Sequence, residues 1–455
     1  MNSGLFFSPP RDAKNHRHAV RLEGKFPLDA LGNRLVVRHT QFPPFKKGHD
    51  MHQYAPAYRI QAAFLGMAAI CCTASSPARA AAPYQPDTTY AVGSIVLGAD
   101  GNDYRSISQA KDIPPTTSDG KHWQLLVVRR VTVLDVPGRF KSIADALMFL
   151  DGATINDSAR VIIEIAAGTY RQKDPVILNH REGGRITVRG GTRTPQETVL
   201  QFLTGDGLIV SDSHAINLER LTVESIASSA KGTGLTVTDR SLAHVADCRF
   251  VNFQSGVSAN STSEISAMST DVISRWDGSG FRSTAGSNGR LVNCRASSTS
   301  NENTGEGFLA FNSGSLSCTG CAAEGWHYGF KAHTTSGLHL LRCSAEGNLV
   351  GISSWWSSAI TATSCSMTRN TNSGIGVFSA TAQISDCRIS SSRDSGCFVH
   401  GSSFLALTDE PTTITACPVG IRSVFGGRAQ QFVPVQFQRI NTPTLEEKPA
   451  QRFNQ

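Results

Sequence analysis

The residues with the clearest chemical potential are two ionisable side chains, Lys331 and His333, in one short alternating segment. Side chains two positions apart in an extended strand point to the same side, so these two would share a face. A base on that face can take the proton next to a uronate carboxyl group while a cation neutralises the carboxyl, which is lyase chemistry. Arg282 lies in an equivalent segment. Lys331, His333 and Arg282 are therefore candidate catalytic residues.

A pair of carboxylates forms a second candidate group. Glu324 and Glu346 each lie in an Ala-Glu-Gly sequence, 22 residues apart. Stacked about 5 Å apart on neighbouring strands, two carboxylates can divide the roles of acid and nucleophile or base. With added carbonyl oxygens they could instead bind Ca²⁺, the one cofactor that the sequence suggests. A solvated pair at a turn, without chemistry, explains the same pattern, and the spacing does not decide among the three.

The spacing of 22 residues belongs to a longer repeat. Cysteines recur with this period, and a glycine followed by an apolar residue keeps step with them, as in Gly329-Phe330 and Gly351-Ile352. A fixed period indicates stacked units, and 22 residues with short apolar alternations are too few for a pair of helices. The sequence therefore predicts an all-β fold, a single-stranded parallel β-helix with about 22 residues per coil and strands about 4.8 Å apart.

Counting from each repeated glycine predicts which side chains point outward. The first and third residues after it are apolar or small and should point inward, so the second and fourth should face solvent. The fourth position carries a ring in five consecutive coils: Phe311, His333, Trp355, Phe378 and His400. Such a row suits stacking on an extended polysaccharide, or burial against another subunit. Trp276 and Trp326, in turns near the same coils, are further candidate substrate-binding residues.

The cysteines suggest packing rather than chemistry. Of the 11 cysteines, Cys71 and Cys72 fall in the N-terminal region described next. In-register parallel strands give neighbouring cysteines a poor geometry for disulfides, so we expect a buried ladder of reduced thiols. Cys318 and Cys321 lack a matching second pair of ligands, so no metal site is predicted. Alignment of the repeats places Asp271 in the cysteine column, where either a local bulge turns it to solvent or it has a special function.

The first 80 residues differ from the rest in charge and hydropathy. The formal net charge of +7 arises there and the remainder is neutral, which argues against nucleic acid as a partner. Residues 60–72 are apolar but too few to span a bilayer, and with Arg59 before them and Ala78-Arg79-Ala80 after them they predict a signal peptide over residues 51–80. Residues 1–50 are then a mis-assigned extension or a disordered arm. We expect a secreted, periplasmic or cell-surface protein without membrane contact after signal removal.

Residues 83–127 read as a small β-module, with short alternating strands broken by Gly, Asp and Pro. The order of Tyr90, Gly93, Tyr104 and Trp123 resembles that of small chitin-binding-type carbohydrate modules. The resemblance implies that Tyr90, Tyr104 and Trp123 stack on sugars, because a flat ring buries the apolar face of a sugar. The same three rings could instead fill the small core.

From Val131 the chain changes character. Residues 142–150 have a helical apolar face, and two strands separated by Gly168-Thr169-Tyr170 follow. This order resembles the start of right-handed parallel β-helices of the pectin-lyase-like superfamily, in which the helix caps the first coil. The resemblance covers residues 131–426, and residues 427–455 lose the period and read as a C-terminal tail. The catalytic motifs of pectinesterases, polygalacturonases and alginate epimerases are absent, so no enzyme class is inherited with the fold.

Two functions remain consistent with the sequence. The first is a secreted protein that binds and degrades an acidic polysaccharide, as a lyase or another depolymerase such as a glycoside hydrolase. The second is a non-catalytic surface or tail-spike-like protein, in which the row of rings binds glycan or joins three copies into a homotrimer. The first predicts a monomer with polysaccharide as its partner, and the second predicts a trimer.

Overall fold

The computed structural model describes residues 81–212, 215–228, 232–300 and 304–447. The predicted extension and signal peptide, residues 1–80, lie outside the described residues. No helix in the described ranges is long and apolar enough to cross a membrane.

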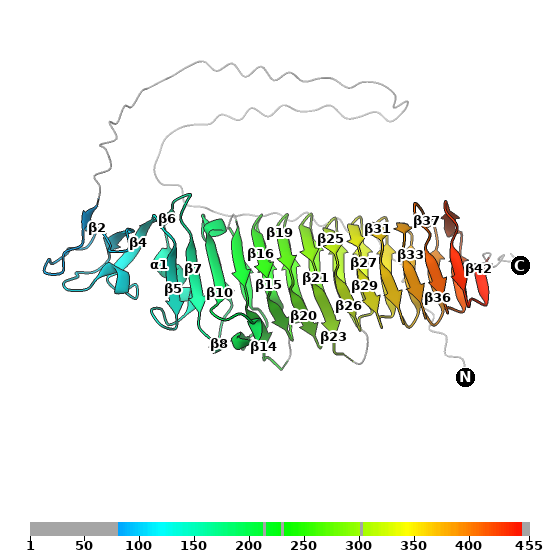
Figure 1. Cartoon of the computed structure of the whole chain (residues 1–455), viewed down its shortest axis with the longest axis horizontal. Coiled ribbons are helices and arrows are strands. Elements are labelled where there is room, and N and C mark those ends of the chain that lie inside the picture. Colours follow the sequence, from blue (N-terminus) through cyan, green and yellow to red (C-terminus); the bar gives the residue numbers. More distant parts are fainter. Residues whose placement is uncertain (1–80, 213–214, 229–231, 301–303, 448–455) are drawn as a thin grey trace, which may run out of the picture. The chain divides into compact units, whose positions relative to one another are not determined.

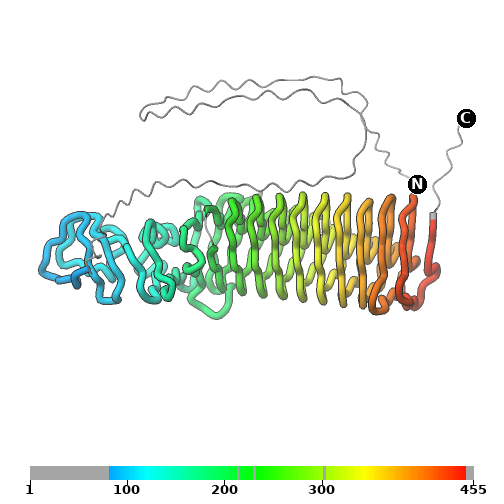
Figure 2. Tube along the Cα trace, turned by 90° about the horizontal axis from the view of Figure 1, so that it is seen from above, coloured from blue at the N-terminus to red at the C-terminus, as the bar shows by residue number. Residues whose placement is uncertain are grey.

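Three parallel sheets form a β-helix, which confirms the predicted fold (Figure 1). Its coils succeed one another along the axis in Figure 2. The first sheet contains β5 (Thr132–Val136), β7 (Val161–Ile165), β10 (Ile186–Gly190), β13 (Ile216–Glu219), β16 (Leu242–Ala246), β19 (Glu264–Met268), β22 (Asn288–Val292), β25 (Ser315–Thr319), β28 (Gly337–Leu341), β31 (Ala359–Thr363), β34 (Thr381–Ser385), β37 (Phe404–Leu407) and β40 (Arg428–Gln431). The second contains β8 (Gly168–Gln172), β11 (Thr198–Phe202), β14 (Thr222–Ser225), β17 (Arg249–Val251), β20 (Asp271–Ser274), β23 (Arg295–Ser298), β26 (Ala322–Glu324), β29 (Ser344–Glu346), β32 (Ser366–Thr368), β35 (Arg388–Ser390), β38 (Thr413–Thr415) and β41 (Gln436–Gln438). The third contains β9 (Val176–Ile177), β12 (Leu208–Val210), β15 (Thr233–Val237), β18 (Ser255–Ala259), β21 (Ser279–Thr284), β24 (Glu306–Phe311), β27 (Tyr328–His333), β30 (Val350–Trp355), β33 (Ser373–Phe378), β36 (Ser395–His400), β39 (Val419–Val424) and β42 (Thr442–Glu447).

Side chains at equivalent positions stack inside the coils and hold their register. The ring centroid of Phe308 lies 5.1 Å from that of Phe281 and 4.7 Å from that of Phe330, and all three side chains are buried. Because a slip of one residue would turn every such ring to solvent, the apolar period fixes the register. The same register determines which residues share the outer face.

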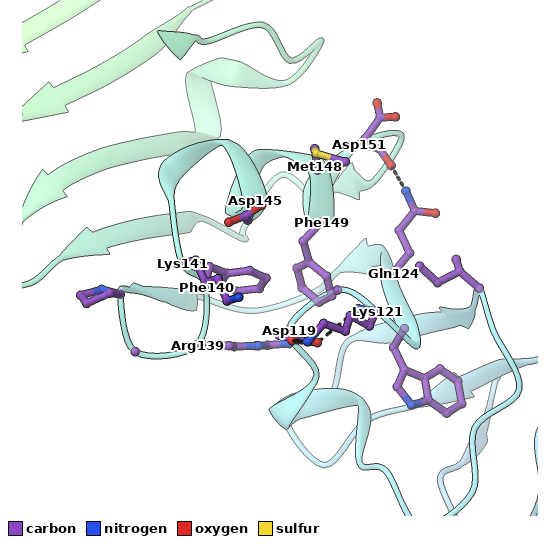
Figure 3. A pocket seen from close by; sticks show the side chains of 15 residues that line it. Asp119, Lys121, Gln124, Arg139, Phe140, Lys141, Asp145, Met148, Phe149 and Asp151 are labelled. Carbon is purple, nitrogen blue, oxygen red and sulfur yellow. Dashed lines mark hydrogen bonds and ion pairs between the residues drawn. The ribbon is translucent and has the colours of Figure 1, made fainter. Parts of the chain in front are cut away.

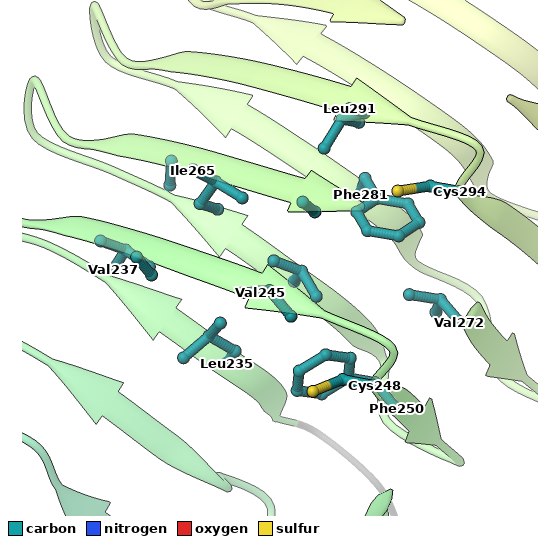
Figure 4. Packing of buried hydrophobic residues seen from close by; sticks show 14 of the residues in the cluster. Leu235, Val237, Val245, Cys248, Phe250, Ile265, Val272, Phe281, Leu291 and Cys294 are labelled. Atoms are coloured by element: carbon teal, nitrogen blue, oxygen red, sulfur yellow. The ribbon is translucent and has the colours of Figure 1, made fainter. Parts of the chain in front are cut away.

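The cysteine column is buried as expected, without disulfides among the described residues. Figure 4 shows Cys248 and Cys294 among the apolar side chains of the interior. The placement of Asp271 in this column is wrong, because Asp271 pairs in register with Arg249 and Arg295, and the buried Thr270 precedes it. Thr270, rather than Asp271, occupies the cysteine position of this coil. The Asp271 carboxylate therefore lies on the outer side of the strand without a bulge.

The corner between the third and first sheets begins with a residue of positive φ. Within the described residues this position is held, with φ between 46° and 69°, by Asp212, Asp239, Ser261, Ala285, Asn312, Thr334, Trp356, Ser379, Gly401 and Phe425. Small and Asx residues tolerate this left-handed conformation, whereas large side chains are rare in it. Trp356 and Phe425 are therefore the unusual members of the series.

Helix α1 (Ile143–Leu150) covers the first coil. Its N-cap Ser142 accepts a hydrogen bond from the Asp145 amide and donates one to the Asp145 carboxylate. The Ser142 side chain thus acts as the N-cap, with the Asp145 carboxylate as its second partner. The helix buries its apolar side, including Phe149 and Leu150, which shields the end of the core.

The segment 83–127 is joined to this cap through one sheet. Its strands are β1 (Ala82–Pro83), β2 (Ile95–Leu97), β3 (Asp103–Ser106) and β4 (Trp123–Val128), and β4 pairs with β6 (Thr154–Ile155). Tyr104 and Trp123 are fully buried, and the ring centroids of Tyr104 and of Phe149 in α1 lie 6.2 Å apart. The expectation that Tyr104 and Trp123 stack on sugar is wrong, because both rings form the core that attaches this segment to the cap.

Short 3₁₀ turns complete the described elements: η1 (Pro115–Thr117), η2 (Gly183–Arg185) and η3 (Pro195–Glu197). At the other end, the predicted tail is partly wrong. Strands β40, β41 and β42 pair with the preceding coil, so the stack continues to Glu447 although the apolar period fades.

Candidate functional site

The predicted row of rings lies on the outer face of the third sheet, in strands β24 to β36. Phe311, His333, Trp355, Phe378 and His400 are paired in register from one coil to the next, as the period predicted. Neighbouring ring centroids are 5.3, 6.4, 4.2 and 6.1 Å apart in that order. We call these five residues the aromatic row.

The rings of the aromatic row lie against the sheet rather than standing away from it. The indole nitrogen of Trp355 donates a hydrogen bond of 2.6 Å to the Ser353 hydroxyl. A Cβ atom at Gly376 would lie 2.7 Å from Cε2 of Phe378, so only glycine fits beneath that ring. The expectation that every second position faces solvent is thus wrong for Ser353, which is buried under its neighbour. The small residues Ser353 and Gly376 at this position let the Trp355 and Phe378 rings lie flat on the sheet.

Two corner rings, neither of them predicted from the repeat, extend the aromatic row. Trp356 lies 4.6 Å from His333 and Phe425 lies 5.1 Å from His400, measured between ring centroids. Both rings are largely exposed. They occupy a corner position that holds a small or polar residue in the other described coils. This departure from the repeat is the sequence signal from which both rings could have been predicted.

Charged side chains lie along one side of the aromatic row. Lys331 Nζ lies 3.0 Å from the Glu306 carboxylate and 4.1 Å from the centre of the Tyr328 ring. The Arg282 guanidinium lies 5.8 Å from the centre of the Phe311 ring, and its buried Nε has no hydrogen-bond partner among the described residues. The structure therefore places Arg282, Lys331 and His333 on one face, as predicted, and adds Glu306 to them.

The surroundings of His333 and Tyr328 set their protonation. Burial and the nearby Lys331 charge lower the pKa of His333 below its usual value. The Nδ1 atom of His333 lies 2.7 Å from the Thr334 hydroxyl, so Nε2 is the ring nitrogen that remains for a ligand. Burial and the Glu306 charge raise the pKa of Tyr328 to about 12. At neutral pH the face thus presents an uncharged imidazole, a proton acceptor, beside a protonated phenol.

The two predicted glutamates lie on a different sheet. Glu324 and Glu346 pair in register on β26 and β29, as the period predicted. Each has its own cation, however: Glu324 lies 2.6 Å from Arg295, and Glu346 forms an ion pair with Arg369. Paired with arginines, and on the second sheet, they do not join Lys331 and His333. No group of three or more potential metal-binding side chains occurs in the described part of the chain.

Trp326, Trp276 and Tyr90, three further residues predicted to bind substrate, differ in their exposure to solvent. Trp326 is fully buried, with its amide bound to the Asn348 side chain, so its expected role in substrate binding is wrong. Trp276 is half-buried and donates its indole hydrogen to the Asn252 carbonyl. Tyr90 is half-buried and packs its ring on Tyr84 at 5.5 Å. Of the two turn tryptophans predicted to bind substrate, Trp276 retains a surface that a ligand can reach and Trp326 does not.

A hollow of about 750 Å³ lies away from this face, between the N-terminal segment and helix α1 (Figure 3). Arg139 crosses it, donating hydrogen bonds to the carbonyls of Ser118 and Pro115, with its guanidinium 4.7 Å from the centre of the Phe149 ring. Burial lowers the pKa of Arg139. These contacts join the N-terminal segment to the cap, and among the predicted site residues only the buried Trp123 borders the hollow.

The chain was compared with known proteins. Segments 186–345 and 298–432 match the family model described as the right handed beta helix region. No curated protein matches the sequence. Similar solved structures include the catalytic unit of a thermostable α-1,3-glucanase from Streptomyces thermodiastaticus, at 10% identity and TM-score 0.38, covering 63% of each chain. A mannuronan C-5 epimerase module from Azotobacter vinelandii matches at 14% identity and TM-score 0.43, covering 71% of this chain and 98% of that one. A periplasmic alginate epimerase matches at 9% identity and TM-score 0.42, covering 73% and 88%.

The chain thus spans less than two thirds of the glucanase catalytic unit. The two segments that match the family model together cover more than half of this chain. The protein therefore belongs to the family of right-handed β-helix proteins.

Proposed function

We propose that the outer face of the third sheet binds a polysaccharide chain along the axis of the β-helix. The observation that carries this proposal is the aromatic row, five rings in register on successive coils. Rings that lie flat on a sheet offer their faces to the apolar C–H groups of sugar rings, while sugar hydroxyls at the edge stay hydrated. A rigid, repetitive surface suits a repetitive ligand.

The charge beside the aromatic row favours an acidic polysaccharide. Arg282 has an unsatisfied donor nitrogen next to Phe311. A carboxylate on a sugar stacked against Phe311 would bind the accessible part of the half-buried Arg282 side chain, and guanidinium groups bind carboxylates with good geometry. Lys331 contributes less net charge, because Glu306 already neutralises it.

We further propose that the face cleaves its ligand by β-elimination. His333, uncharged because its pKa is lowered, takes the proton next to the uronate carboxyl group, and Arg282 neutralises that carboxyl. The electrons of the broken C–H bond form a carbon–carbon double bond and expel the glycosidic oxygen, which takes a proton from Lys331. The products are a new reducing end and an unsaturated uronate. Hydrolysis would require a pair of free carboxylates, and Glu324 and Glu346 are each paired with an arginine.

A second function uses the same rings differently. Three copies of a non-catalytic, tail-spike-like protein could bury the aromatic row between them as a homotrimer, since large exposed apolar surfaces often mark subunit contacts. The exposed Trp356 and Phe425 are consistent with either role. We propose a secreted or periplasmic location for both.

The test combines activity with size. The full chain is incubated with polygalacturonate, alginate and hyaluronan, the ultraviolet absorbance of unsaturated uronates is followed, and the mass in solution is measured by light scattering. We expect binding and cleavage by a monomer, with cleavage lost in His333→Ala and Lys331→Ala and retained in Leu341→Ala, which alters an exposed residue of the first sheet. A stable trimer that binds none of the polymers would overturn the proposal.

A further inference from the structure

Each of the two histidines of the aromatic row contacts one ring of the preceding coil and one ring at the following corner. His333 lies 5.3 Å from Phe311 in the preceding coil and 4.6 Å from Trp356 at the corner of the following coil. His400 lies 6.1 Å from Phe378 in the preceding coil and 5.1 Å from Phe425 at the corner of the following coil. In each case an imidazole stands between a ring of the row and an exposed corner ring.

Among the described corners with positive φ, a large ring occurs only where a histidine of the aromatic row precedes it by one coil. At the other described corners the same position holds Asp, Ser, Ala, Asn, Thr or Gly. Trp356 and Phe425 adopt φ angles of 46° and 52°, a left-handed conformation that large side chains rarely adopt. They also expose 56% and 61% of their surfaces. Large rings placed at a strained, exposed position in two of the coils, each against a histidine, indicate a function rather than packing.

The two groups lie three coils apart. The register runs from His333 through Trp355 and Phe378 to His400, which is about 14 Å along the axis at about 4.8 Å per coil. Between them, Trp355 and Phe378 are stacked at 4.2 Å. The intervening surface is therefore continuous and aromatic, and one extended ligand can lie across both groups.

We infer that these groups are two equivalent subsites, in each of which one sugar stacks on the exposed corner ring beside the histidine that this ring contacts, and that a single polysaccharide chain occupies both. This inference rests on the proposed polysaccharide function and specifies how the ligand is held. Linking two sites through one ligand makes the second contact intramolecular, which raises affinity by about 100-fold or more without new contacts. The face thus selects long chains over short fragments.

The test is a calorimetric titration of the full chain with oligogalacturonates and oligomannuronates of increasing length, from the disaccharide upward. We expect short fragments to bind weakly with two per chain, and fragments that span both subsites to bind about 100-fold more tightly with one per chain. In Phe425→Ala the short fragments should bind with one per chain, and the gain with length should disappear. Phe432→Ala is the matched control, because Phe432 is 58% exposed and lies outside the aromatic row.

The outcomes separate the inference from the function on which it rests. A steady rise of affinity with length, or a gain that persists in Phe425→Ala, would overturn the two subsites while leaving polysaccharide binding intact. Equal losses in Phe425→Ala and Phe432→Ala would also overturn them. Failure of all fragments to bind would reject the proposed function and the subsites together.

Discussion

The cysteine column inside the coils and the aromatic row outside them repeat with the same period but differ in chemistry. Inside, from Cys248 to Thr412, the repeated position holds a small buried cysteine or threonine, and the neighbouring thiol together with burial raises the pKa of Cys343 to about 12. Outside, the repeated position holds phenyl, imidazole and indole rings with polar partners and partial exposure. The period alone therefore identifies packing, and it is the chemical variety within the period that locates a function.

The largest effect should follow from removing a buried ring. Trp326→Ala leaves a cavity in the core, and substitutions of this kind lower the free energy of unfolding by about 3–5 kcal/mol. Urea unfolding followed by circular dichroism measures the change. A variant as stable as the wild type would show that Trp326 is not part of the core.

The next effect concerns the aromatic row. Trp355→Ala removes the central ring, which stacks on Phe378, and should weaken polysaccharide binding by about 30-fold, the effect of a typical hot spot near 2 kcal/mol. Its unfolding free energy should fall much less than that of Trp326→Ala, since the Trp355 ring is half exposed. Calorimetry with Leu341→Ala as the control measures the binding. Equal affinities of Trp355→Ala and Leu341→Ala for the polysaccharide would contradict the assignment of Trp355 to the binding surface.

A smaller effect is expected for the cysteine column. Cys343→Ala removes one buried sulfur atom and should lower the unfolding free energy by about 1 kcal/mol, without changing ligand affinity. Cys343→Ala should therefore change mainly stability, whereas Trp355→Ala should change mainly polysaccharide binding. Loss of binding in Cys343→Ala at unchanged stability would mean that the thiols have a chemical role.

The smallest effect is on the pH dependence of stability. The pKa of His333 is lower in the folded protein than its usual value of 6.5, so the unfolded state binds more protons as the pH falls through this range. Stability should therefore decrease as the pH drops below about 6.5, and His333→Asn should reduce that slope. His180, whose pKa burial also lowers, contributes in the same direction and remains in the variant. Urea midpoints from neutral to acidic pH would show identical slopes if His333 were not perturbed.

Much of this arrangement could be predicted from the repeat. The period and the alternation predicted the coils and the aromatic row, because burial on one face of a strand leaves a direct pattern in the sequence. The cap was predicted from the helical apolar face of residues 142–150 together with the resemblance to pectin-lyase-like β-helices. Asp271 was misplaced, because one residue of difference in coil length moves a side chain to the opposite face. Trp326 and Trp123 were misjudged, because an aromatic side chain in a turn or small module has the same sequence signature whether it is buried or exposed.

Other features depend on contacts between coils. The ion pair between Lys331 and Glu306 joins residues 25 positions apart, and no local pattern indicates it. The arginine partners of Glu324 and Glu346 likewise come from neighbouring coils. The corner rings were the exception, since their position in the repeat could have been compared with that of small residues in other coils.

The central claim, that the aromatic row holds a polysaccharide, is tested most directly by hydroxyl-radical footprinting of the full chain with and without the bound polymer. The account predicts protection confined to the row and its corner rings, above all Trp355, Trp356 and Phe425, with Phe432 and Met268 unchanged. Protection of these rings that depends on protein concentration rather than on polysaccharide, or protection by polysaccharide elsewhere on the surface, would contradict it.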